Sequence, residues 1–284
     1  GARFFRVNGN GEGNLFVVDI ATKAEKQITQ GASDTVNWGV AEFVAQEEMD
    51  RHTGHWWSPD DAHIAVAKVD ESDVGIVNRA AIGAEGTKIY PQRYPVAGSP
   101  NAIVELYVMD PLSGSQVKVN LGDDTDIYLA RVDWSKDGKT LYVQRQSRDQ
   151  KRLDLLAVDP ETGAAKTVLT ETAKTWLNLH SNFRALTDGS FLWWSEKSGH
   201  GHLSRVTGKD WTALTSGDWE VRDIIGVDEK KGLVYFSGNR ETPIEQHVYS
   251  APLSGKGNVE LLTETGWWNG GVMDGAASRI IVSR

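Results

Sequence analysis

Two adjacent carboxylates are the residues in this chain with the clearest capacity for chemistry. Glu47 and Glu48 lie in residues 44–51, whose types suit a short helix among strand-like segments. Two carboxylates aimed into a cavity repel each other and need a cation. A peptide α-amino group has an ordinary pKa of about 7.7–8.0, so it is mostly charged at neutral pH. The pair is therefore a candidate ammonium site, although an adjacent Glu pair taken alone is more often a solvated helix face.

Three other residues are candidates for a supporting role. Arg51 is expected to form an ion pair that orients the acidic helix, with an ordinary surface ion pair of little energetic value as the alternative. Asn178 and His180 lie where a later β unit begins, and they are expected either to line a channel or to pack in the core. His52 and His55 flank the Glu pair, but a zinc site needs three or four ligands in fixed geometry. No metal site and no cofactor is therefore predicted.

The composition limits the classes of partner. With 284 residues, 39% of them hydrophobic, the chain can bury a sizeable core. The formal net charge of -9 argues against binding to nucleic acid, whose phosphates require clustered Lys and Arg. The absence of cysteine excludes disulfides, thiolate nucleophiles and Cys-based zinc sites. No apolar run approaches the length of a membrane span, so no membrane segment is predicted.

The elements that must position the Glu pair are β-strands that repeat along the chain. One unit is an aromatic residue and a turn followed by an apolar strand, as at residues 57–67 and 134–143. A second unit, a strand and a short closing strand, alternates with it, as at residues 15–29. The spacing of about 45 to 50 residues is typical of four-stranded propeller blades, which bury their faces by stacking. We predict an all-β, partial β-propeller of about five blades, with about four full blades and partial ones at both ends, and we expect the helix at residues 44–51 to lie between two blades.

Two segments depart from this repeat. Between residues 70 and 102 about thirty residues are inserted between strands, and a loop of that length is usually functional. We expect an interaction arm there, with a flexible insertion as the alternative. The chain opens on a strand at residues 4–7 and a glycine-rich hairpin loop at residues 8–13, which is typical of a start within a domain. A closed ring and an arc of a larger ring are both consistent with the sequence.

A family resemblance becomes specific around the Glu pair. Residues 42–59, EFVAQEEMDRHTGHWWSP, resemble the double-glutamate motif of the dipeptidyl peptidase IV family, particularly its bacterial members and the dipeptidyl peptidase 8 and 9 branch. Residues 94–101 (YPVAGSPN) and 219–221 (WEV) are further similarities. The resemblance covers nearly the whole chain, so residues 1–284 are interpreted as one β-propeller fragment from the N-terminal region of such a peptidase.

The resemblance implies an eight-bladed propeller joined to a C-terminal α/β-hydrolase domain, in a serine peptidase that releases X-Pro or X-Ala dipeptides. Glu47 and Glu48 would then bind peptides that have a free N-terminus and bring their second peptide bond to the serine. It also implies a homodimer formed partly through the arm at residues 70–97. A periplasmic or secreted location is favoured for a bacterial parent, with a cytoplasmic one as the alternative.

The sequence departs from the family pattern in what it lacks. It contains no Gly-x-Ser-x-Gly nucleophile motif, and the hydrolase domain and an upstream substrate-binding arginine are absent. The chain by itself is therefore expected to be inactive. Two alternatives stay open: a stand-alone propeller that acts as a protein-interaction scaffold, and a family member whose serine has been replaced.

Overall fold

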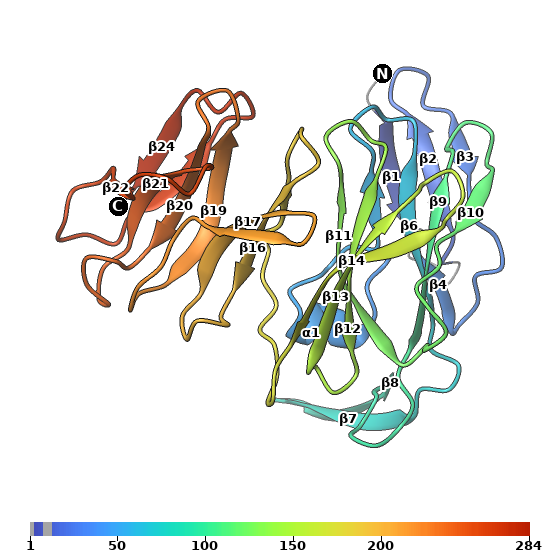
Figure 1. Ribbon diagram of the computed structural model, residues 1–284. Helices are drawn as coiled ribbons and strands as arrows, with labels where there is room; N and C mark the ends of the chain where they lie inside the picture. The colour runs from blue at the N-terminus through green and yellow to red at the C-terminus, as the bar shows by residue number, and fades with distance from the viewer. Residues whose placement is uncertain (1–2, 8–12) are drawn as a thin grey trace. The chain divides into compact units, whose positions relative to one another are not determined.

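The computed structural model describes residues 3–7, as backbone only, and residues 13–284. Most of the glycine-rich loop expected at residues 8–13 therefore lies outside the described residues. Within them the chain is built of β-strands and one short helix, α1 (Phe43–Glu48). The strands fall into two compact units, Gly1–Leu179 and His180–Arg284, which are considered separately below (Figure 1).

The first unit contains three propeller-type sheets and a hairpin. The first sheet has the order β1-β2-β3, the second has the order β10-β9-β6-β4 with β5 also paired to β6, and the third has the order β11-β12-β13-β14. Strands β7 and β8 pair only with each other and form the hairpin. The strands are β1 (Arg3–Val7), β2 (Leu15–Asp19), β3 (Glu25–Gln27), β4 (Val36–Trp38), β5 (His55–Trp57), β6 (Ile64–Asp70), β7 (Ile76–Gly83), β8 (Gly86–Arg93), β9 (Ile103–Met109), β10 (Gln116–Lys118), β11 (Ile127–Trp134), β12 (Leu141–Ser147), β13 (Arg152–Val158) and β14 (Ala165–Thr172).

The second unit continues the pattern with two four-stranded sheets, β15-β16-β17-β18 and β19-β20-β21-β22, and a two-stranded sheet, β23-β24. Neighbouring strands in all these sheets are antiparallel, as hairpin connections require. The succession of full sheets with smaller ones at both ends is the one predicted from the repeats. The strands are β15 (Arg184–Ala185), β16 (Phe191–Ser195), β17 (His202–Thr207), β18 (Asp210–Ala213), β19 (Val221–Asp228), β20 (Leu233–Gly238), β21 (His247–Pro252), β22 (Glu260–Leu261), β23 (Gly270–Met273) and β24 (Ile280–Ser283).

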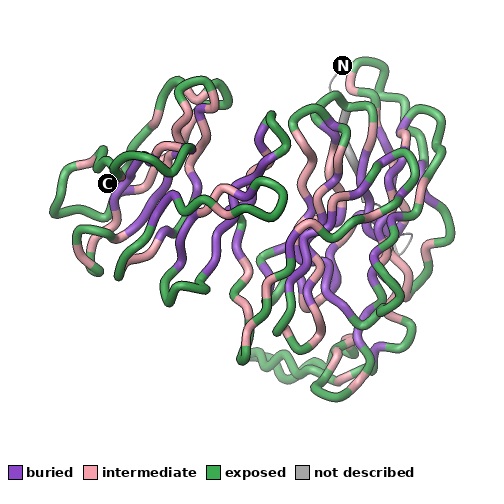
Figure 2. Tube along the Cα trace, in the orientation of Figure 1, coloured by how far each residue is buried: buried purple, intermediate pink, exposed green. Residues whose placement is uncertain are grey.

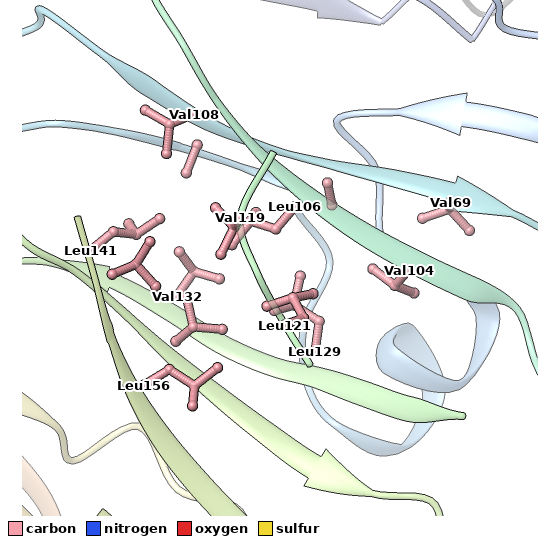
Figure 3. Close-up of a cluster of buried hydrophobic side chains, with 14 of the residues drawn as sticks. Val69, Val104, Leu106, Val108, Val119, Leu121, Leu129, Val132, Leu141 and Leu156 are labelled. Carbon is pink, nitrogen blue, oxygen red and sulfur yellow. The ribbon is translucent and has the colours of Figure 1, made fainter. Parts of the chain in front are cut away.

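The largest core cluster of the first unit lies between its second and third sheets (Figure 3). Leu106 of β9 and Leu129 of β11 are fully buried there, together with Leu141 and Val143 of β12. Full burial of such a side chain stabilises the fold by about 1.5–3 kcal/mol. In the inner strands of the blades most residues are buried, and in the turns most are exposed, as expected for sheets that cover each other's faces, whereas β7 and β8 are mostly exposed (Figure 2).

A threonine hydroxyl closes one end of three sheets, a repeat that the sequence analysis missed. In each case the threonine follows Ile or Leu, and its hydroxyl accepts a backbone N–H at the start of another strand. In two of the sheets a histidine precedes that N–H and contacts the same hydroxyl, His202 at 3.0 Å and His247 at 3.1 Å. The three backbone bonds are Leu15 N to Thr29 Oγ1 (2.7 Å), Leu203 N to Thr215 Oγ1 (2.9 Å) and Val248 N to Thr263 Oγ1 (3.2 Å).

The bonding of His202 fits a neutral ring. Its Nε2 lies 2.9 Å from the carbonyl of Gly217, to which an Nε2–H can donate, and its Nδ1 can then accept from the hydroxyl of Thr215. Burial lowers the pKa of His202 below its ordinary value of 6.5. The hydroxyl of Thr215 thus both donates and accepts within the protein interior.

We predict that Thr215→Val destabilises the chain by about 1–3 kcal/mol, because it leaves the buried N–H of Leu203 without its acceptor. Thr215→Ser, which keeps the hydroxyl, is the matched control and should retain most of the stability. Urea unfolding followed by tryptophan fluorescence measures both variants. Equal stability of the Val and Ser variants would contradict a role for this hydroxyl.

Candidate functional site

Helix α1 interrupts an edge strand of the second sheet. Strands β4 and β5 pair with the two halves of the same neighbour, β6, so that Val36 lies opposite Asp70 and Trp57 lies opposite Ile64. The residues between β4 and β5 leave the sheet and carry the helix. The expected position of the helix between two blades is therefore wrong. The excursion lies within one blade, because β4 and β5 occupy one strand position.

Two glycines close the neck of this excursion. Gly39 has a φ of 72°, and its N–H donates to the carbonyl of Ala67 at 2.8 Å. The N–H of Ala67 in turn donates to the carbonyl of Gly54 at 2.7 Å. A Cβ atom on Gly54 would lie 2.1 Å from the carbonyl oxygen of Val40, so any other residue would force the neck apart.

A buried ion pair joins the two ends of the helix. Arg51 donates from Nη2 to Oε2 of Glu42, and the two side chains are only 3% and 1% exposed. Arg51 also donates from Nη1 to the carbonyl of Thr53 at 2.9 Å, and its backbone N–H donates to Ala45 at 3.0 Å. The surface ion pair considered for Arg51 is therefore wrong. Its effect on the orientation of the Glu pair stays a prediction.

One face of the helix is apolar and buried against the sheet, and the Glu pair lies on the exposed side. Ala45 is fully buried and Met49 is 3% exposed, and both pack with Tyr128 of β11. These two residues are four positions apart and so share one face of the helix. Glu47 and Glu48 are exposed. The local sequence thus fixes which side of the helix is available to a ligand.

A cavity of about 440 Å³ adjoins the C-terminal end of α1 in the first unit. Glu48 lines this cavity, whereas the residue before it, Glu47, is not among the lining residues. The lining is mostly polar, with amides, two carboxylates and one guanidinium beside an indole. Its residues are Glu48, Met49, Asp50, Arg131, Gln146, Gln150, Trp176, Leu177, Asn178 and Leu179.

Hydrogen bonds and charge order the wall of this cavity. Trp176 donates from Nε1 to Oδ1 of Asn178 at 3.2 Å, and Gln146 donates from Nε2 to the carbonyl of Leu177 at 3.2 Å. Burial lowers the pKa of Arg131, an effect that the nearby carboxylate of Asp50 opposes. Asn178 and Glu48 line the same cavity, and the role of Asn178 in a channel stays a prediction.

His180, the other expected channel residue, lies in the core of the second unit. It is 8% exposed, and its ring centroid lies 4.9 Å from that of Trp193 and 5.2 Å from that of Trp194. Its Nδ1 accepts the backbone N–H of Asn182 at 3.2 Å. These contacts are those of the core-packing alternative rather than of a channel wall.

Among residues 3–7 and 13–284, no three His, Asp or Glu side chains are grouped so as to hold a metal ion. The single helix of the described chain is also too short to cross a membrane.

Comparison with known proteins identifies the family. Residues 10–283 match the model of the "Dipeptidyl peptidase IV (DPP IV) N-terminal region". The chain belongs to this family. Human dipeptidyl peptidase 8 is 25% identical over 337 residues, which cover 89% of this chain and 38% of that protein. The probable dipeptidyl-aminopeptidase B of Uncinocarpus reesii is 28% identical over 275 residues, covering 86% of this chain and 30% of that protein.

Solved structures agree on the fold. The crystal structure of Porphyromonas gingivalis dipeptidyl peptidase 4 has a TM-score of 0.87 and 24% identity, covering 99% of this chain and 42% of that one. A putative dipeptidyl aminopeptidase IV from Bacteroides ovatus has a TM-score of 0.80 and 20% identity, covering 99% and 47%. The prediction of an all-β, partial β-propeller is confirmed, as is the family predicted from residues 42–59. The chain spans less than half the length of these relatives.

We predict that Arg51→Met destabilises the chain by about 3–5 kcal/mol, because it leaves the carboxylate of Glu42 buried without its partner. The double variant Glu42→Leu/Arg51→Met should lose less, since apolar side chains often replace a buried ion pair at little cost. Unfolding in guanidinium chloride measures the stability of the unmutated chain and of both variants. Arg79→Met, on the exposed hairpin, serves as the control and should change stability by no more than about 0.5 kcal/mol. A double variant less stable than Arg51→Met would contradict the assignment.

Proposed function

We propose that this chain is the substrate-anchoring propeller region of a serine dipeptidyl peptidase, in which Glu47 and Glu48 bind the α-ammonium group of a peptide. The observation that carries the proposal is the orientation of helix α1 on the blade. The helix buries Ala45 and Met49 and leaves both carboxylates exposed, with Glu48 on a polar cavity. The names of the relatives, dipeptidyl peptidase and dipeptidyl-aminopeptidase, support it.

The chemistry follows from the charge and donor count of the ligand. An ammonium group has three N–H donors, and each charged hydrogen bond to a carboxylate contributes about 1.5–3 kcal/mol. A clamp on the free amine fixes the register of the peptide, so the position of the cleaved bond is set by its distance from the clamp. The side chains of Gln146 and Asn178 line the same cavity as Glu48 and so lie near the place proposed for the first residue of the peptide.

We propose, as the family resemblance implies, that a serine of a C-terminal α/β-hydrolase domain cleaves the bond; these 284 residues themselves contain no Gly-x-Ser-x-Gly motif. The propeller would supply binding and register, and the hydrolase domain would supply the nucleophile. The division means that changes to the Glu pair should alter how well and where the peptide is held, while the reactivity of the serine stays unchanged.

We predict that Glu47→Gln or Glu48→Gln in the full-length protein lowers kcat/KM for an X-Pro fluorogenic substrate by about two orders of magnitude or more, since each removes charged hydrogen bonds to the ammonium. Glu25→Gln, an exposed acid on β3, is the control and should be neutral. An N-acetylated substrate, which has no ammonium group, should be cleaved poorly by every variant. Near-normal dipeptide release by either Glu variant would refute the anchoring role.

We also propose that the full-length protein is a homodimer formed partly through the β7–β8 hairpin, hereafter the arm. The pairing of Ala80 with Ile89 and of Ile82 with Thr87 puts the even-numbered residues of β7 and their partners on one face. Ile76, Ile82 and Ile89 on that face are 60%, 85% and 59% exposed. An exposed apolar face of this kind marks an interaction surface.

We predict that Ile82→Glu/Ile89→Glu converts the full-length protein from dimer to monomer, because the new charges would be buried in the apolar interface. Light scattering coupled to size-exclusion chromatography gives the mass of each variant. Lys88→Glu, on the opposite face of the arm, is the matched control and should stay dimeric. A dimer that persists in the double variant would exclude the arm face as the interface.

A further inference from the structure

We propose that the base of the arm positions helix α1, and that Tyr94 is the positioning residue that holds the Glu pair in its binding orientation. The inference rests on the proposed function of Glu47 and Glu48. It goes beyond that function by linking the substrate anchor to an element outside the site, through one side-chain contact.

An aromatic pair makes the link. Phe43 is the first residue of α1, and its ring meets that of Tyr94 edge-on, with centroids 5.1 Å apart and an interplanar angle of 64°. Edge-to-face contact at this separation is a favoured arrangement of aromatic rings. Tyr94 directly follows β8, and its N–H donates to the carbonyl of Gly75, which directly precedes β7, at 2.9 Å. The backbone of Tyr94 is thus held where the two strands of the arm meet the blade, and its ring contacts the helix.

Charged groups make a second connection at the same place. Arg93, the last residue of β8, donates from Nη1 to the carbonyl of Val74 at 2.8 Å. Burial raises the pKa of Glu71, and the carboxylate of Glu42 raises it further, while Arg93 opposes the shift. Glu42 is the N-cap residue of α1. The start of the helix and the base of the arm therefore share one electrostatic environment.

The helix depends on such contacts because it is short. It has six residues, and its N-cap makes no side-chain capping hydrogen bond. Isolated helices of this length are not stable in water. Phe43 and Glu47 are four residues apart and so lie on the same face, which means that a displacement of Phe43 carries Glu47 with it. A partner bound to the arm would therefore alter the affinity of the anchor for its substrate.

The test uses the full-length protein and the variants Tyr94→Leu, Tyr94→Phe and Glu47→Gln. Tyr94 is 39% exposed, so its replacement should leave the fold intact. We expect Tyr94→Leu to raise KM for an X-Pro substrate about tenfold through misplacement of the anchor, and Tyr94→Phe to behave as wild type. In the Glu47→Gln background, Tyr94→Leu should add less than about twofold, because the two residues act through the same interaction.

Amide hydrogen exchange over residues 43–51 gives a readout that does not involve activity. The N–H groups of Met49 and Arg51 donate to Ala45, and both should exchange faster in Tyr94→Leu than in Tyr94→Phe. Unchanged exchange, or multiplicative effects of Tyr94→Leu and Glu47→Gln on kcat/KM, would overturn the inference. A Glu47→Gln variant with wild-type kinetics would instead refute the proposed function, and the exchange comparison would still decide the link to the arm.

Discussion

The site depends on one constraint, which is that a six-residue helix must be held rigidly outside a β-sheet. Such a helix has too few internal hydrogen bonds to persist alone. Its position comes from the glycine neck, where Gly39 and Gly54 bond to Ala67, and from the buried pair of Glu42 and Arg51. Burying two charges is expensive unless their partners are well placed. Part of that cost is offset here because the guanidinium of Arg51 also donates from Nη1 to the carbonyl of Thr53.

The orientation of the acidic residues follows from what lies beneath them. Because the apolar side of α1 packs on Tyr128, the acidic side has only solvent and the cavity to face. The two carboxylates are not equivalent, since Glu48 lines the cavity and Glu47 does not. A ligand that bonds to both must therefore reach from the cavity toward the exposed face of the helix, which suits a compact group with several donors.

Much of the blade succession was predictable from the sequence, because alternating apolar strands and turn residues are local signals. The place of the helix within a blade was not, since β4 and β5 have only three residues each and their common partner is set by long-range pairing. Glu42 was missed as the partner of Arg51, because nine residues separate them and no periodicity links the two. For His180 the sequence left channel lining and core packing open, since a histidine beside two indoles has no sequence signature that decides between them.

The excursion leaves and re-enters the blade at a single residue of the neighbouring strand. The carbonyl of Ala67 accepts from the N–H of Gly39, and the N–H of Ala67 donates to the carbonyl of Gly54. The edge strand paired with β6 therefore resumes after the excursion in the register in which it left. The pairing of the sheet therefore does not depend on how many residues lie between the two glycines. Segments of other lengths can be exchanged at this neck if they keep the packing on Tyr128 and the ion pair of Glu42 with Arg51. A propeller of this kind can therefore acquire a new binding specificity through exchange of the segment between Gly39 and Gly54.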